Sequence, residues 1–225
     1  IYKITFDDVT GYYSFVKEGS GGGGGSQGPQ TIGLIGSATY FEWGKDIDMT
    51  KDSGNPDVWK LRTYLKVGEV KFRADDSWDT NWGGTAFPNG VGTSGGPNIP
   101  VATAGYYDVT INIRTGAYSF TLLDINALTK YNAVGLIGSA TPGGWNTDTP
   151  MTASSSNPHL WTVTVTLTKD EVKFRANNSW DVNWGGKDFP ADLGYQNGPN
   201  IPVAEAGSYK VTFDSVTGYY KFEKQ

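Results

Sequence analysis

The sequence contains no cysteine, a single histidine, and only 18 lysine and arginine residues against 23 acidic ones. Without cysteine, neither disulfides nor cysteine-ligated metal can stabilise the fold. The net charge of −5 argues against nucleic acid as a partner, because phosphate binding requires clustered cations that displace counterions. A neutral ligand such as a glycan remains compatible with this composition.

Long apolar runs are missing as well. No segment approaches the roughly 20 apolar residues that span a bilayer, and no signal peptide opens the chain. The chain starts in mid-pattern at Ile1, so we expect a fragment of a longer precursor. In contrast, 31 glycines, 8 tryptophans, 13 tyrosines and 10 phenylalanines are present among 225 residues. Glycine punctuates turns, and aromatic residues favour strands and flat binding surfaces.

An internal repeat organises the chain. A shift of 102 positions aligns long blocks without a gap, and VKFRADDSWDTNWGG at 70–84 matches VKFRANNSWDVNWGG at 172–186. Such a match predicts two homologous modules, 31–124 and 133–225, joined by a short linker at 125–132. The linker is short enough to restrict how the modules are oriented relative to each other.

A partial third copy opens the chain, because YKITFDDVTGYYSF at 2–15 resembles YKVTFDSVTGYYKF at 209–222. We interpret residues 1–18 as the closing hairpin of a preceding module and the glycine-rich segment 19–30 as a flexible linker. The sequence leaves open whether these segments are native or engineered, and how many modules lie upstream. An isolated hairpin is marginally stable, so we expect it to join a sheet edge or to be disordered.

Apolar and polar residues alternate with a period of two in segments such as WTVTVTL at 161–167, and the turns carry Thr-Gly, Asn-Gly and Gly-Gly. This pattern predicts an all-β protein of two tandem antiparallel β-sandwich modules of the immunoglobulin-like or carbohydrate-binding kind.

The VKFRA strand carries the first candidate site residues. Val70, Phe72 and Ala74 share one face, and Lys71 and Arg73 share the other. Paired cations on a strand can donate hydrogen bonds to sugar hydroxyls, or they can be a solvated face or pair with nearby aspartates. The sequence does not decide among these three roles for either copy of the strand.

The tryptophans differ in their surroundings. Trp59 and Trp161 begin alternating strands and are expected in the core, whereas Trp43 and Trp145 lie in loops and are candidate stacking platforms for sugar rings. In the SWD-x-NWGG segment, one tryptophan of each pair can cap the sandwich while the other faces ligand, and the spacing of four leaves open which one does. The predicted carbohydrate-binding residues are Trp43, Lys71, Arg73, Trp78, Asn81 and Trp82 in the first module, and Trp145, Lys173, Arg175, Trp180, Asn183 and Trp184 in the second.

Catalysis, metal and cofactors are not expected. A glycoside hydrolase needs two carboxylates flanking the bond, but a small module with a shallow tryptophan-rich surface rarely builds a water-excluding cleft. His159 has Asp57 as its counterpart, so no histidine is common to both copies, and no P-loop, nucleophile-elbow or zinc spacing occurs. The acidic loop at 46–57 leaves calcium open, although solvated acids are the favoured interpretation.

Several blocks in order, IGSAT-x3-W, VKFRA-x2-SWD-x-NWGG, GPNIPV-x-x-AG and the closing hairpin, resemble the C-terminal modules of SusE/SusF-type outer-membrane starch-binding lipoproteins of Bacteroidetes. The resemblance covers residues 31–225. It implies a monomeric, lipid-anchored array on the outer-membrane surface that holds polysaccharide near a glycan importer complex without cleaving it. Starch or another α-glucan is the ligand it favours. The alternatives are a different glycan, such as β-glucan or levan, or a structural or adhesive array that binds a protein.

Overall fold

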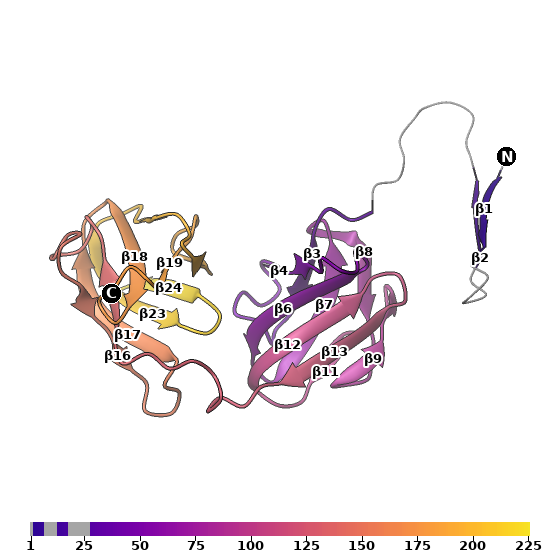
Figure 1. Cartoon of the computed structure of the whole chain (residues 1–225), viewed down its shortest axis with the longest axis horizontal. Helices are drawn as coiled ribbons and strands as arrows, with labels where there is room; N and C mark the ends of the chain where they lie inside the picture. The colour runs from indigo at the N-terminus through magenta and orange to yellow at the C-terminus, as the bar shows by residue number, and fades with distance from the viewer. Residues whose placement is uncertain (1, 7–12, 18–27) are drawn as a thin grey trace. The chain divides into compact units, whose positions relative to one another are not determined.

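The computed structural model describes residues 2–6, 13–17 and 28–225, and every regular element in them is a β-strand (Figure 1). The predicted all-β class with two tandem antiparallel sandwiches is confirmed. Within the same residues, no helix is both long and apolar enough to cross a membrane. The chain divides into two compact units, Ile1–Gln30 and Thr31–Gln225.

The first unit contains β1 (Tyr2–Phe6) and β2 (Tyr13–Lys17), which form a two-stranded antiparallel sheet. Its register runs from Tyr2 opposite Lys17 to Phe6 opposite Tyr13. The last two strands of each sandwich pair with the same spacing, which agrees with the sequence match between these segments. The connection at 7–12 and most of the glycine-rich segment predicted as a linker, 18–27, lie outside the described residues.

The first sandwich consists of β3 to β13 (Figure 1). One sheet has the order β10-β8-β7-β3-β4, with β11 also pairing with β7, and the other has the order β5-β6-β12-β13-β9. The strands are β3 (Ile32–Ile35), β4 (Ile47–Asp48), β5 (Thr50–Lys51), β6 (Val58–Leu65), β7 (Gly68–Ala74), β8 (Ser77–Gly83), β9 (Asn89–Val91), β10 (Thr93–Ser94), β11 (Ile99–Val101), β12 (Gly105–Asn112) and β13 (Ala117–Leu122).

The second sandwich repeats this plan with β14 to β24. Its sheets have the orders β15-β14-β18-β19-β21, with β22 pairing with β18, and β16-β17-β23-β24-β20. The strands are β14 (Val134–Ile137), β15 (Thr149–Pro150), β16 (Thr152–Ala153), β17 (Leu160–Leu167), β18 (Glu171–Ala176), β19 (Asn183–Gly185), β20 (Ala191–Leu193), β21 (Tyr195–Gln196), β22 (Ile201–Pro202), β23 (Gly207–Asp214) and β24 (Tyr219–Lys224).

Each sandwich has its own hydrophobic core between its two sheets. Period-two alternation places every second side chain of a strand inward. On β7, Val70, Phe72 and Ala74 are buried as predicted, which leaves the opposite face for the cations. Trp59 and Trp161 are also buried, as expected for tryptophans that begin alternating strands.

The two sandwiches meet in a joint within the second unit. Tyr40, in the loop after β3, stacks on Tyr219 of β24 with ring centroids 3.9 Å apart and planes inclined by 4°. The Tyr40 hydroxyl donates to Asp214 Oδ2 at 2.7 Å, and the Tyr106 hydroxyl donates to the same oxygen at 2.8 Å. Burial raises the pKa of both phenols, so they remain protonated donors at neutral pH. The joint therefore rests on ring stacking together with two hydrogen bonds to one carboxylate oxygen.

Candidate functional site

A buried ion pair lies on the outer face of the β3–β7 pair. Arg73 Nε donates to Asp46 Oδ1 at 2.8 Å and to Oδ2 at 2.7 Å, with the side chains 11% and 1% exposed. Gly33 lies opposite Arg73 on β3 and makes the approach possible. A Cβ atom at Gly33 would lie 2.6 Å from the Cβ of Asp46. Burial raises the pKa of the Asp46 carboxyl, and the Arg73 charge opposes that rise.

The second sandwich builds the same pair. Arg175 Nε donates to Asp148 Oδ1 at 2.8 Å, with the side chains 10% and 6% exposed. A Cβ atom at Gly135 would lie 2.7 Å from the Cβ of Asp148. Asp46 and Asp148 therefore serve to fix an arginine, which is one of the alternatives that the sequence left open for the cationic strand face.

We predict that Gly33→Ala lowers the stability of the first sandwich by about 1–3 kcal/mol, because the new methyl group overlaps Asp46 and displaces it from Arg73. Urea unfolding measures the change. Gly28→Ala is the control, since a Cβ atom at Gly28 meets nothing within 4 Å. Identical unfolding midpoints for the two variants would contradict the packing of Asp46 over Gly33.

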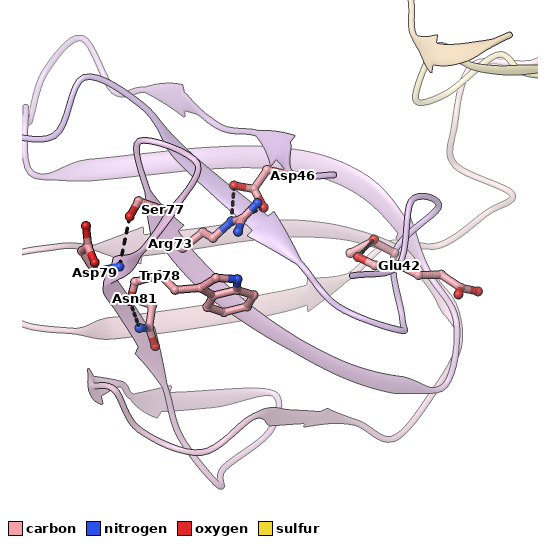
Figure 2. A network of polar contacts seen from close by, with 8 residues as sticks. Glu42, Asp46, Arg73, Ser77, Trp78, Asp79 and Asn81 are labelled. Atoms are coloured by element: carbon pink, nitrogen blue, oxygen red, sulfur yellow. Dashed lines mark hydrogen bonds and ion pairs between the residues drawn. The ribbon is translucent and has the colours of Figure 1, made fainter. Parts of the chain in front are cut away.

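A tight turn and a bulge bring a tryptophan onto the arginine. Asp75 and Asp76, with φ of 52° and 53°, connect β7 to β8 in the geometry that suits a two-residue hairpin turn. The register shifts between Arg73 and Ala74, and such irregularities redirect the side chains that follow. Trp78 then lies against the Arg73 guanidinium, with Cζ 4.8 Å from the ring centroid, while Asp46 contacts Arg73 from the opposite side (Figure 2).

The same arrangement recurs in the second sandwich. Asn177 and Asn178, with φ of 53° and 55°, form the turn. Arg175 Cζ lies 4.8 Å from the Trp180 ring centroid. Cation–π contact of this kind stabilises an arginine stacked on an indole, so each ion pair also positions a tryptophan.

An exposed pair of indoles is the feature that the two sites share at the surface. Trp43 and Trp78 have ring centroids 6.2 Å apart and planes inclined by 39°, and Trp145 and Trp180 have centroids 6.1 Å apart and planes inclined by 36°. Their exposed fractions are 40%, 48%, 37% and 46%, whereas most other large aromatic side chains within residues 28–225 are buried or half-buried. Each site therefore presents two tilted apolar faces to solvent. We name these surfaces the first platform (Trp43 and Trp78) and the second platform (Trp145 and Trp180).

The loop before each platform tryptophan passes through a left-handed residue. That residue is Glu42 in the first sandwich, with φ of 55°, and Gly144 in the second, with φ of 56°. The two copies thus reach the same backbone geometry with different residues. The loop conformation is therefore common to both sites even though the sequences before Trp43 and Trp145 differ.

The other predicted site residues lie away from the platforms or support them. Trp82 packs against the first core and Trp184, 7% exposed, belongs to the second, so we assign neither a role in ligand contact. Asn81 and Asn183 donate to the backbone oxygens of Trp78 and Trp180 at 2.8 and 2.9 Å. Their amides hold the loops that carry the platforms, which limits them to an indirect role.

Lys71 and Lys173 share the face of the arginines, as the alternation predicts. Burial lowers the pKa of both ammonium groups. Lys173 Nζ donates to the Gly198 oxygen at 2.8 Å. This contact engages the Lys173 ammonium with the backbone of the loop before β22.

Two carboxylates of the acidic loop at 46–57 have partners within the first sandwich. Asp46 is engaged by Arg73, and Asp52 accepts the backbone N–H groups of Gly54 and Asn55. In the described part of the chain, no group of three histidine, cysteine, aspartate or glutamate side chains is arranged to hold a metal ion.

The fold was compared with solved structures. The crystal structure of SusF from Bacteroides thetaiotaomicron is similar over 87% of this chain and 49% of that chain, with 17% sequence identity and a TM-score of 0.37. This chain thus spans about half the length of SusF. No protein-family model and no curated protein matches the sequence.

Proposed function

We propose that each sandwich is a non-catalytic carbohydrate-binding module and that the two together hold one polysaccharide chain. The observation that carries this proposal is the repeated platform, in which two exposed indoles are held in place by a buried arginine–aspartate pair. Sugar rings present apolar C–H faces, and an indole face matches them in shape and polarity. The tilt between the indoles suits a chain that curves from one ring to the next.

The charge of the protein and the tilt between the indoles support a proposal for the ligand class. The acidic chain and its neutral, aromatic platforms favour a neutral glycan. We propose an α-glucan such as starch first, because its chain curves, and a flat β-glucan or levan as the alternatives. The sequence blocks that resemble SusE/SusF-type lipoproteins support a role at the outer-membrane surface, where the protein would supply polysaccharide to an importer.

Catalysis has no support from the site. Among the repeated carboxylates, Asp46 and Asp148 are each engaged by an arginine and are 1% and 6% exposed. Glu69 and Glu171 accept hydrogen bonds from the Asn98 and Asn200 amides. A hydrolase requires a pair of carboxylates that can reach the glycosidic bond from both sides. The platforms therefore favour holding the glycan over cleaving it.

Native affinity electrophoresis in gels containing amylopectin, mixed-linkage β-glucan or levan tests the proposal. We expect slower migration in amylopectin and unchanged migration in a gel without polysaccharide. Retardation by β-glucan or levan alone would retain the binding function and replace the ligand. Unretarded migration in all three gels would leave an adhesive array that binds a protein as the better account of the exposed tryptophans.

A further inference from the structure

A cleft of about 600 Å³ lies between the two sandwiches. Phe41, Lys45 and Asp48 line it from the first sandwich, and Lys187, Asp192 and Tyr195 line it from the second. Asp46 also borders it, and this residue anchors Arg73 beneath Trp78. The cleft therefore reaches the ion pair that supports Trp78 of the first platform.

An ion pair network holds the two sides of the cleft together. Lys45 Nζ donates to Asp188 Oδ2 at 2.8 Å and to Asp192 Oδ1 at 2.9 Å. The same ammonium lies 5.3 Å from the ring centroid of Phe41, which packs on Tyr219 with ring centroids 5.8 Å apart. These contacts belong to the joint between the sandwiches, and they engage Lys45, Phe41 and Asp192 of the cleft lining.

Three side chains of the cleft have no such engagement. Within residues 28–225, no hydrogen bond or ion pair engages the Asp48 carboxylate, the Lys187 ammonium or the Tyr195 hydroxyl, and no ring packs on Tyr195. Tyr195 is 53% exposed. Burial raises the pKa of Asp48, the charges of Asp76 and Asp192 raise it further, and the charge of Lys45 opposes that rise. An acceptor, a donor and an aromatic face thus line one space, which is the set of groups that a sugar unit satisfies.

The repeat shows that this lining is specific to the cleft. A shift of 102 positions places Gly143, Thr147 and Pro150 where the first sandwich has Phe41, Lys45 and Asp48. The reverse shift places Thr85, Gly90 and Thr93 where the second sandwich has Lys187, Asp192 and Tyr195. The residues that line the cleft therefore have no equivalent at the matching positions of the other sandwich. Contact between the sandwiches explains the change at Lys45 and Asp192, but not at Asp48, Lys187 and Tyr195.

We propose that the cleft is an additional glycan subsite shared by both sandwiches, and that it extends the first platform. This rests on the proposed function. A neutral glycan chain lying on Trp43 and Trp78 continues into the cleft. There one sugar unit stacks on Tyr195, donates a hydroxyl proton to Asp48 and accepts a hydrogen bond from Lys187. The first platform then binds a longer stretch of glycan than the second, although the platforms themselves are nearly identical.

The test isolates the first platform in the full chain. In a Trp145→Ala background, dissociation constants for maltotriose and maltoheptaose are measured by calorimetry. If β-glucan or levan retards the wild type and amylopectin does not, oligosaccharides of the retarding glycan with three and seven units replace maltotriose and maltoheptaose. Adding Tyr195→Ala should weaken heptasaccharide binding by about threefold to tenfold, the value of one aromatic contact, and leave trisaccharide binding unchanged. Thr93→Ala, at the equivalent position of the first sandwich, is the matched control and should change neither constant.

The reverse background excludes a local role for Tyr195. With Trp43→Ala in place of Trp145→Ala, the Tyr195→Ala substitution should have no effect. Equal heptasaccharide affinity with and without Tyr195 in the Trp145→Ala background overturns the shared subsite and leaves the platforms intact. A loss confined to the Trp43→Ala background overturns it as well, because Tyr195 would then serve the second platform. A wild-type protein that binds no glycan rejects the proposed function itself, before any variant is compared.

Discussion

Replacing Trp43 and Trp145 together by alanine should abolish retardation in the polysaccharide gel, with affinity for the polymer falling by at least about 100-fold. Each substitution removes one of the two exposed indoles of a platform and leaves its partner without a tilted neighbour. Two weak sites on one chain gain roughly 10²–10⁴ in avidity when the polymer reaches both. Losing both platforms removes the contacts and the avidity at once.

The single variants separate these two contributions. Trp43→Ala or Trp145→Ala alone should leave one working platform, so binding of a short oligosaccharide persists while polymer avidity is lost. Affinity electrophoresis and calorimetry with the same protein samples measure the two quantities. Val67→Ala is the control, because Val67 is a large apolar side chain, 66% exposed, that belongs to neither platform. Full retardation of the double variant, with its fold intact, would show that glycan binds elsewhere.

The fold was predictable from the sequence because its signals are local. Alternation placed Val70, Phe72 and Ala74 inward and left Lys71 and Arg73 on the opposite face, as the structure has them. The sequence suggested that Trp78 and Trp82 differ in exposure but did not show which one is exposed, because a strand with regular alternation would place residues four apart on the same face. The register shift after Arg73 breaks that alternation, and the sequence has no direct signal for it.

The ion pair between each arginine and its aspartate was difficult to predict from the sequence for a different reason. Arg73 and Asp46 are 27 positions apart, and their contact depends on the missing side chain of Gly33 on a third segment. The available signal was the repeat, because the same three residue types recur as Gly135, Asp148 and Arg175 at the same spacing. A glycine, an aspartate and an arginine retained together in both copies indicate a packed ion pair.

The joint between the sandwiches depends on a difference between the copies. Asp214 in the second sandwich has Asn112 as its counterpart in the first. Both side chains accept two backbone N–H groups of the following turn through Oδ1. Asp214 alone presents a second acceptor, Oδ2, to the hydroxyls of Tyr40 and Tyr106. The repeat shows the substitution, but only the structure shows that the second carboxylate oxygen faces the neighbouring sandwich.

Asp214→Asn should therefore lower the free energy of unfolding by about 2–4 kcal/mol, because an amide cannot accept from four donors as the carboxylate does. The turn keeps its cap, as it does at Asn112, while the hydroxyls of Tyr40 and Tyr106 lose their acceptor. Burial raises the pKa of Asp214, but the four donors that surround it favour the charged form and oppose that rise. The asparagine consequently removes an interaction that is specific to the joint and leaves the local turn in place.

Calorimetric unfolding distinguishes this effect from general damage. We expect the wild type to unfold in one cooperative transition and the Asp214→Asn variant to unfold in two, since each sandwich has a core of its own once the joint is weakened. The reciprocal variant Asn112→Asp is the matched control and should unfold like the wild type, because its new oxygen faces no phenol in the described residues. If Asp214→Asn leaves both the transition temperature and its cooperativity unchanged, Asp214 does not stabilise the joint. Unfolding as one transition at a lower temperature would instead place the lost stability within the second sandwich.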